Sequence, residues 1–289
     1  MFILENQQLK IAVNPIGAEL DSVFHKGTQL EYMWSGDAQF WGKKSPVLFP
    51  IVGSLKDNTY FLGGEKYQLS RHGFARERVF ILEKQDDISL LFTLQHDSET
   101  LKKYPFKFVF KVKYTLIENI LKVTYLVENQ SVTTMPFSVG AHPAFKIPLV
   151  ADTTYEDYFL ELNQPETFGR YPLSSDGLIE QKSNPFLENS AKIPLKNELF
   201  YADAVVLKNM QSDRMSIKSD KTPHGLTMDF TGFPYFGIWA AKDAPFVCLE
   251  PWCGIADTVS TTQNIVEKEG INLLEAGGVF ERSWGIEMF

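Results

Sequence analysis

The chain has 289 residues, 44% of them hydrophobic and 22% charged, which is an ordinary composition for a globular protein. A chain of this length buries about three quarters of its unfolded surface, so it needs neither a disulfide framework nor a metal to fold. The formal net charge of −8 disfavours nucleic acid as a partner, because phosphate binding needs a basic surface.

Cys248 and Cys253 are separated by four residues, and no second pair at metal-ligand spacing accompanies them, so we expect no metal. The first residues, MFILENQQLK, lack the basic start and apolar run of a signal peptide, and no apolar run is long enough to span a membrane. We therefore expect a cytoplasmic protein without a membrane partner. Because no linker, charge block or repeat divides the chain, residues 1–289 are expected to form a single domain.

In chain order, the first predicted features are turns. Lys26–Gly27 and Gly63–Gly64 are turn dipeptides, and residues 37–44 (DAQFWGKK) are compatible with a helical turn or two. Residues 87–97 (DISLLFTLQHD) then alternate apolar and polar side chains, which predicts a strand. Residues 96–105 (HDSETLKKYP) form a second short segment that favours a helical turn.

The middle of the chain carries the clearest strand pattern. Residues 107–119 and 120–131 both alternate at period two and meet at Glu118–Asn119, which predicts a hairpin. Later turns are expected at Asp176–Gly177 and Gly277–Gly278. Further strands, rich in aromatic and β-branched residues, are predicted at 235–242, 246–252 and 282–289. With weak helical periodicity throughout and no repeat, the sequence predicts an all-β, sandwich-like fold.

The five histidines fall into two groups. His25 precedes a turn, His96 ends a predicted strand and His224 stands in a polar loop (DKTPHGL), so these three are expected at the surface without a special role. His72 in RHGFARERVF and His142 in GAHPAF lie among glycine, proline and aromatic residues that fix the local backbone. Two interpretations stay open for them. In the structural one both rings are bonded to backbone carbonyls, and in the functional one they are held so that they reach a ligand.

Glu250, in the segment VCLEPWC, ends an apolar predicted strand. A carboxylate there is costly to bury without a partner, and a salt bridge to an arginine is one explanation. The other is acid–base chemistry together with the two histidines at strand ends. No spacing places two metal ligands on one element, and no GxSxG, GxGxxG or phosphate-binding loop motif is present, which disfavours metal, nucleophilic and nucleotide chemistry.

Six segments in order resemble the aldose 1-epimerases, also described as galactose mutarotase-like proteins. They are GAELDSV, PVLFPIVG, HGFARERVF, FSVGAHPAF, LEPWCGIAD and LLEAGGVFERSWGIEMF, which run from Gly17 to the C-terminus. The resemblance is strongest to the branch typified by LacX-like proteins of lactic-acid bacteria. It implies a large twisted β-supersandwich of the galactose mutarotase type and an isomerase that interconverts the anomers of a hexose.

The resemblance also implies roles for individual residues. It assigns His142 as the general acid and Glu250 as the general base, and it places His72 and Asp203 on the sugar hydroxyls. It implies no metal and no cofactor. The partner is then a small sugar, bound by a monomer or a dimer. Aromatic residues near these motifs, namely Trp252, Phe74 and Phe145, are expected in the core rather than against the sugar.

Two departures leave the substrate open. Many relatives carry an arginine where this chain has Ser54, and Lys56 is the substitute that we expect to contact the sugar, although a lysine does not reproduce an arginine fork. Arg76, with Arg71 or Lys43, would suit a phosphate, so a hexose 6-phosphate is an alternative substrate. A carbohydrate-binding protein without catalysis is a further alternative.

Overall fold

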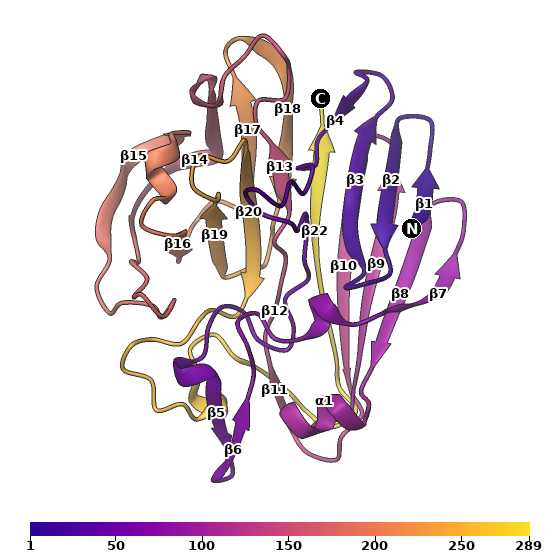
Figure 1. The fold of residues 1–289 in the computed structure, drawn as a ribbon, viewed down its shortest axis with the longest axis vertical. Helices are drawn as coiled ribbons and strands as arrows, with labels where there is room; N and C mark the ends of the chain where they lie inside the picture. The colour runs from indigo at the N-terminus through magenta and orange to yellow at the C-terminus, as the bar shows by residue number, and fades with distance from the viewer.

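The structure, a computed structural model, describes all of residues 1–289 and confirms the prediction of an all-β fold. It contains 22 strands, one α-helix and five short 3-10 helices (Figure 1). The helix α1, Ser98–Lys103, lies inside the predicted segment 96–105, and the Asp97 carboxylate caps the free N–H of Thr100 at its start. The 3-10 helices are η1 Lys56–Asn58, η2 Ala75–Glu77, η3 Tyr155–Asp157, η4 Asn197–Phe200 and η5 Ile265–Glu267.

Nine antiparallel strands form the largest sheet, in the order β15-β14-β17-β18-β22-β10-β9-β8-β7. Their bounds are β7 Ile81–Gln85, β8 Ser89–Gln95, β9 Phe108–Ile117, β10 Ile120–Asn129, β14 Tyr158–Arg170, β15 Asn184–Pro194, β17 Arg214–Ser219, β18 Thr222–Asp229 and β22 Val279–Met288. The predicted hairpin at Glu118–Asn119 is confirmed as β9–β10. Alternate residues of β10 point into the core, as its period-two pattern requires.

Two smaller sheets pack against this one. The first contains β12 Val139–Gly140, β13 Ala144–Lys146, β16 Val205–Lys208, β19 Tyr235–Trp239 and β20 Phe246–Cys253. The second contains β1 Phe2–Glu5, β2 Leu9–Asn14, β3 Glu19–His25 and β4 Leu30–Glu31. Two-stranded sheets are formed by β5 Thr59–Leu62 with β6 Glu65–Gln68, and by β11 Met135–Phe137 with β21 Asn272–Leu274.

The layers meet through aromatic side chains. Phe2 of β1 packs edge-on against Phe92 of β8 with ring centroids 5.5 Å apart, and Figure 1 shows β1–β3 in front of β8–β10. Phe236 of β19 lies 4.4 Å from Phe230, which follows β18. A cluster of 68 buried residues fills the space between the sheets, so the fold is a sandwich held together mainly by apolar burial.

One local prediction was confirmed and another was wrong. Residues 37–44 contain one helical turn, in which the N–H groups of Phe40 and Trp41 donate to Asp37 O, and no helix longer than this turn. His224 lies within β18 and not in a loop, because Asp220 and Lys221 alone make the turn between β17 and β18. The proline that suggested a loop occupies the start of the strand, where its missing N–H is tolerated.

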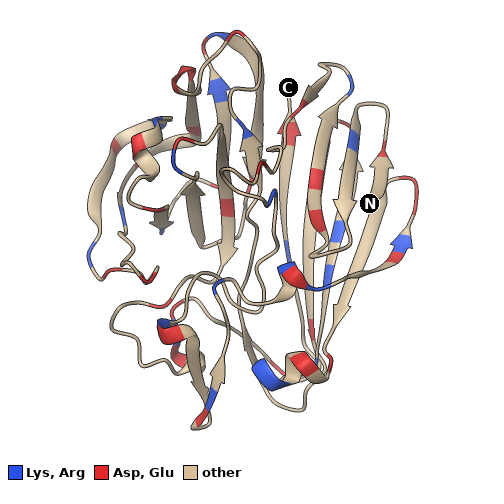
Figure 2. Cartoon of the chain, in the orientation of Figure 1, with Lys and Arg blue, Asp and Glu red and all other residues tan.

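Charged residues of both signs are spread over strands and loops, as Figure 2 shows. Several form surface ion pairs, such as Lys218 with Glu161 at 2.6 Å. None of the helices has the length and apolar character required to cross a membrane.

Candidate active site

His142 lies in a short break between β12 and β13. Pro143, which has no N–H to donate to a sheet ladder, accounts for the break. The backbone is nevertheless fixed on both sides, because Ala141 N donates to Pro251 O and Leu249 N donates to Pro143 O. The sequence expectation of a histidine held rigidly at a strand end agrees with this geometry.

The register of the sheet brings His142 to Glu250. Both β12 and β13 pair antiparallel with β20. The paired residues on either side of the break are Gly140 with Trp252 and Ala144 with Cys248. The same register, continued across the break, places His142 directly opposite Glu250. The two side chains therefore meet because of strand pairing between segments that are distant in sequence.

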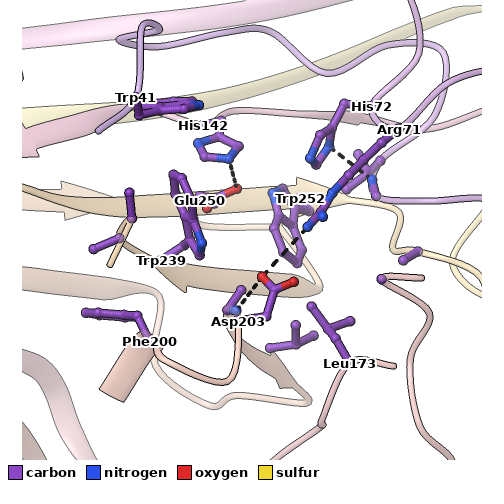
Figure 3. Close-up of a pocket in the computed structure, with 18 of the residues that line it drawn as sticks. Trp41, Arg71, His72, His142, Leu173, Phe200, Asp203, Trp239, Glu250 and Trp252 are labelled. Carbon is purple, nitrogen blue, oxygen red and sulfur yellow. Dashed lines mark hydrogen bonds and ion pairs between the residues drawn. The ribbon is translucent and has the colours of Figure 1, made fainter. Parts of the chain in front are cut away.

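His142 and Glu250 form a buried contact (Figure 3). His142 Nε2 lies 3.3 Å from Glu250 Oε2, and the two residues are only 8% and 2% exposed. Burial lowers the pKa of His142 and raises the pKa of Glu250, because a low-dielectric site disfavours both charged forms. Arg71 and the Trp252 side chain oppose this effect at Glu250 and favour its carboxylate form. These opposite shifts favour a form of the pair that shares one proton and carries no net charge.

Tryptophans surround the histidine of this pair. The indole of Trp41 stacks on the His142 ring with centroids 4.9 Å apart, and Trp239 meets the same ring edge-on at 5.6 Å. Trp252 projects from β20 two residues beyond Glu250, on the same face of the strand. These rings keep water from the proton-sharing pair and offer flat apolar faces to a ligand.

His72 lies beside His142, with ring centroids 5.7 Å apart. Its backbone is in the left-handed region, with φ of 67°, and the glycine that follows continues this tight path with φ of 71°. The N–H of Gly53 donates to His72 Nδ1 at 3.1 Å, so a neutral His72 carries its proton on Nε2. Burial lowers the pKa of His72, and His142 acts in the same direction, so the ring is a neutral hydrogen-bond donor.

Charged residues form the other end of the site. Arg71 Nη2 lies 3.9 Å from Asp203 Oδ1, and the Arg76 guanidinium donates to Arg71 O at 3.0 Å. Arg76 also approaches the Glu77 carboxylate, with Nε 4.0 Å from Oε1. Asp203 is held in the left-handed region with φ of 73°, and its carboxylate accepts the N–H of Ala204.

These groups line one cavity of about 580 Å³. Six of the residues singled out in the sequence contribute to it, namely Arg71, His72, Arg76, His142, Asp203 and Glu250. The rest of the lining is mostly apolar and includes Leu173 and Phe200 (Figure 3). A concave apolar site with a few convergent polar groups suits a small molecule that carries several hydroxyls.

The structure does not bring Lys56 together with the other candidate site residues. Lys56 is absent from the cavity lining, and its ammonium donates to Val259 O at 3.3 Å. The cation near Ser54 is Arg71 instead. A Cβ added to Gly177 would lie 2.9 Å from Ser54 Oγ and 3.5 Å from Arg71 Nη1, so both groups face the same small residue. Lys43 likewise lies outside the lining and approaches Glu19 at 3.6 Å.

Sequence reasoning missed most of the aromatic lining. Trp252 belongs to a small buried core cluster, as expected, but also lines the cavity, whereas Phe74 and Phe145 are core residues outside the lining. Trp41 belongs to a loop without regular structure, and Trp239 ends β19. The sequence did contain one signal that Trp252 lines the same site as Glu250. The two residues are two positions apart on a predicted strand, and such residues share a face.

One group of side chains has donor atoms that could hold a metal ion. A donor atom from each of His142, Cys248 and Glu250 lies within 4.8 Å of the others. Burial raises the pKa of the Cys248 thiol and of the Glu250 carboxyl, so both groups favour their protonated forms, which are poor ligands. The cluster is therefore poorly suited to hold a metal ion.

The fold and site together define an all-β sandwich protein with a buried acid–base pair in a cavity of small-molecule size. The family model described as aldose 1-epimerase matches residues 1–280. The chain belongs to the aldose 1-epimerase family.

Individual relatives agree with this assignment. The chain is 36% identical over 278 residues to the chromosomal protein LacX of Lactococcus lactis subsp. lactis, covering 91% of each chain. A galactose mutarotase related enzyme from Lactobacillus acidophilus superimposes with a TM-score of 0.95 at 35% identity, covering 100% of this chain and 97% of that one. A galactose mutarotase-like protein from Lactobacillus casei ATCC 334 gives a TM-score of 0.91 at 33% identity, with both chains fully covered. The predicted supersandwich of galactose mutarotase type is thereby confirmed.

Proposed function

We propose that the protein is an aldose 1-epimerase that interconverts the α- and β-anomers of a hexose. The observation that carries this proposal is the buried contact of 3.3 Å between His142 Nε2 and Glu250 Oε2 in the sugar-sized cavity. Anomer exchange needs one group to remove a proton from the C1 hydroxyl and another to protonate the ring oxygen. A pair that shares a single proton supplies both groups.

In the proposed reaction, the shared proton first moves from Glu250 to His142. The Glu250 carboxylate then accepts the proton of the C1 hydroxyl while the His142 imidazolium protonates the ring oxygen. The C1–O5 bond breaks with its electron pair moving to O5, and C1 becomes an aldehyde carbon. The pair is now neutral, which is the state that burial favours. Rotation about C1–C2 followed by the reverse transfers closes the ring as the other anomer, so the reaction is balanced without a cofactor.

The remaining polar groups are proposed to hold the sugar. His72 donates from Nε2 to a sugar hydroxyl, since its Nδ1 is already bonded to Gly53. Asp203 accepts hydrogen bonds from two adjacent hydroxyls, and Arg71 beside it donates. Trp41 and Trp252 cover the apolar faces of the ring. Each positioned proton transfer is worth roughly 100- to 10,000-fold in rate.

A hexose 6-phosphate is the second candidate substrate. The proximity of Arg71 and Arg76 to each other in the same cavity supports it, because guanidinium groups bind phosphate through paired charge-assisted hydrogen bonds. The contact of Arg76 with Glu77 reduces the charge available to a phosphate and favours a neutral sugar.

Polarimetry on freshly dissolved α-anomers tests the proposal. Galactose, glucose and glucose 6-phosphate are compared with and without the protein, and the proposal predicts faster mutarotation of at least one. If sugar binds, as seen by titration calorimetry, while every rate stays at the spontaneous value, the protein is a carbohydrate-binding protein and the proposal is wrong.

A further inference from the structure

A buried ion pair lies behind the cavity wall and has no part in the proposed proton transfers. Lys268 Nζ is 3.0 Å from Asp257 Oδ1, and both side chains are only 2% exposed. Removing two charges from water is costly, and apolar residues of similar size often stabilise a fold equally well.

The pair ties together two segments without regular strand structure. Asp257 Oδ2 accepts the N–H of Lys56 at 3.0 Å, and Asp257 N donates to Ser54 O at 2.8 Å. Lys268 Nζ also donates to Ile255 O at 2.5 Å. Backbone groups outside a sheet must be bonded by side chains or water, and here two buried charges do this. The segments 53–56 and 254–257 are docked on each other as a result.

The docked segment 53–56 is the one that holds the His72 ring. Gly53 O accepts the N–H of His72 at 2.9 Å, and Gly53 N donates to His72 Nδ1 at 3.1 Å. Gly53 is pressed against Ala256 so closely that a Cβ on it would lie 2.4 Å from the Ala256 Cβ. Any shift of the 254–257 segment therefore moves the N–H that fixes the His72 tautomer.

We propose that Asp257 and Lys268 are positioning residues that fix the orientation and tautomer of His72, and thereby set the affinity for the sugar. The inference rests on the proposed function, in which His72 Nε2–H donates to a sugar hydroxyl. If the Gly53 hydrogen bond loosens, a fraction of His72 carries its proton on Nδ1 and presents an acceptor to the sugar. The loss of one hydrogen bond corresponds to roughly a three- to tenfold weaker affinity.

Two paired variants test this inference in graded steps. Asp257→Asn with Lys268→Met removes both charges but keeps an oxygen acceptor for Lys56 N. Asp257→Ala with Lys268→Met removes the acceptor as well. We expect KM for the sugar to rise about three- to tenfold, more in the second variant than in the first, with kcat within about twofold of wild type.

Nitrogen NMR of the histidine rings distinguishes a positioning role from a purely structural one, because only a positioning role changes the tautomer of His72. Wild-type His72, identified from the spectrum of His72→Gln, is expected in a single tautomer with the proton on Nε2. In the second paired variant a population protonated on Nδ1 should appear. Glu166→Gln is the matched control, because Glu166 is also a buried carboxylate that bonds two backbone N–H groups, at Gln211 and Ser212, outside the cavity. It should lower thermal stability and leave KM and the His72 spectrum unchanged.

The inference is overturned if the second paired variant keeps the wild-type KM and the single His72 tautomer. If the second variant does not fold, the same result in the first variant overturns it. It is also overturned if KM rises with no change in the His72 spectrum. These results are distinct from failure of the proposed function. In that case wild type would not accelerate mutarotation of any sugar, whereas the tautomer of His72 and the dissociation constant of the sugar can still be measured.

Discussion

The two ends of the cavity differ in their access to water. His142 and Glu250 are almost fully buried among tryptophan rings, whereas the side chains of Arg71 and Asp203 at the other end are 46% and 33% exposed. An ion pair between such exposed groups contributes little by itself and exchanges readily with hydroxyl groups of a ligand. In the proposed reaction, this difference separates proton transfer, which benefits from a dry environment, from recognition of a soluble sugar, which does not require one.

The largest effect on the rate is expected from substitutions in the proposed acid–base pair at the buried end of the cavity. Glu250→Gln and His142→Asn should each lower kcat by at least about 100-fold, because each removes one positioned proton transfer. Polarimetric rates are to be measured beside melting curves. A buried structural ion pair would instead lose stability on the order of 3–5 kcal/mol when one partner is removed, with the folded fraction still active. A well-folded and fully active Glu250→Gln would exclude Glu250 from the mechanism.

The burial of this pair also predicts how stability depends on pH. The lowered pKa of His142 means that the unfolded chain binds more protons below pH 6.5, so wild type loses stability as the pH falls below that value. His142 contributes about 2 kcal/mol to this loss between pH 6.5 and 5, and His142→Asn should remove that part while the part due to the buried His72 remains.

The contribution of Glu250 to folding stability depends on pH in the opposite direction. Its raised pKa stabilises the folded state below pH 4.5, and this contribution is lost as the pH rises through the folded-state pKa. Glu250→Gln should therefore reduce the loss of folding stability that occurs as the pH rises above 4.5. Urea unfolding at a series of pH values checks both variants, and equal pH dependence in wild type and variants would contradict the account.

At the solvent-exposed end of the cavity, Asp203→Asn should raise KM by about tenfold and change kcat much less. The reason is that a charged acceptor for the sugar hydroxyls becomes a neutral one. Asparagine tolerates the left-handed backbone of this position, so the loop should keep its conformation. Asp243→Asn is the matched control, since Asp243 is another left-handed aspartate and lies outside the cavity lining. An equal effect of both substitutions on KM would argue against a sugar contact at Asp203.

The smallest effect is expected for Arg76→Ala. Because Arg76 already approaches Glu77 and bonds Arg71 O, the ratio of the affinities for glucose and glucose 6-phosphate should stay within about threefold of wild type. Titration calorimetry with both sugars gives this ratio. A selective loss of affinity for the phosphorylated sugar would favour the hexose 6-phosphate as substrate.

The sequence predicted those parts of the molecule that depend on local pattern. The β9–β10 hairpin follows from alternation over adjacent segments, and the turn at Gly63–Gly64 follows from two glycines that both adopt positive φ. The rigid setting of His142 follows from the neighbouring proline. In each case the residues that determine the structure are close together in the chain.

What the sequence could not predict depends on contacts between distant segments. Trp41 comes from a loop whose position over His142 is set by tertiary packing. Lys56 was expected at the ligand, but its backbone is bound by Asp257 from the far end of the chain, and this turns the residue towards Val259. No local pattern reveals either contact.

The most direct test of the central claim is the exchange of magnetisation between the α- and β-anomer signals of a hexose at equilibrium, followed by NMR. The account predicts an exchange rate that increases in proportion to the concentration of wild-type protein and returns to the spontaneous value with Glu250→Gln, while that variant still binds the sugar. An exchange rate independent of wild-type concentration for free and phosphorylated hexoses alike would contradict it.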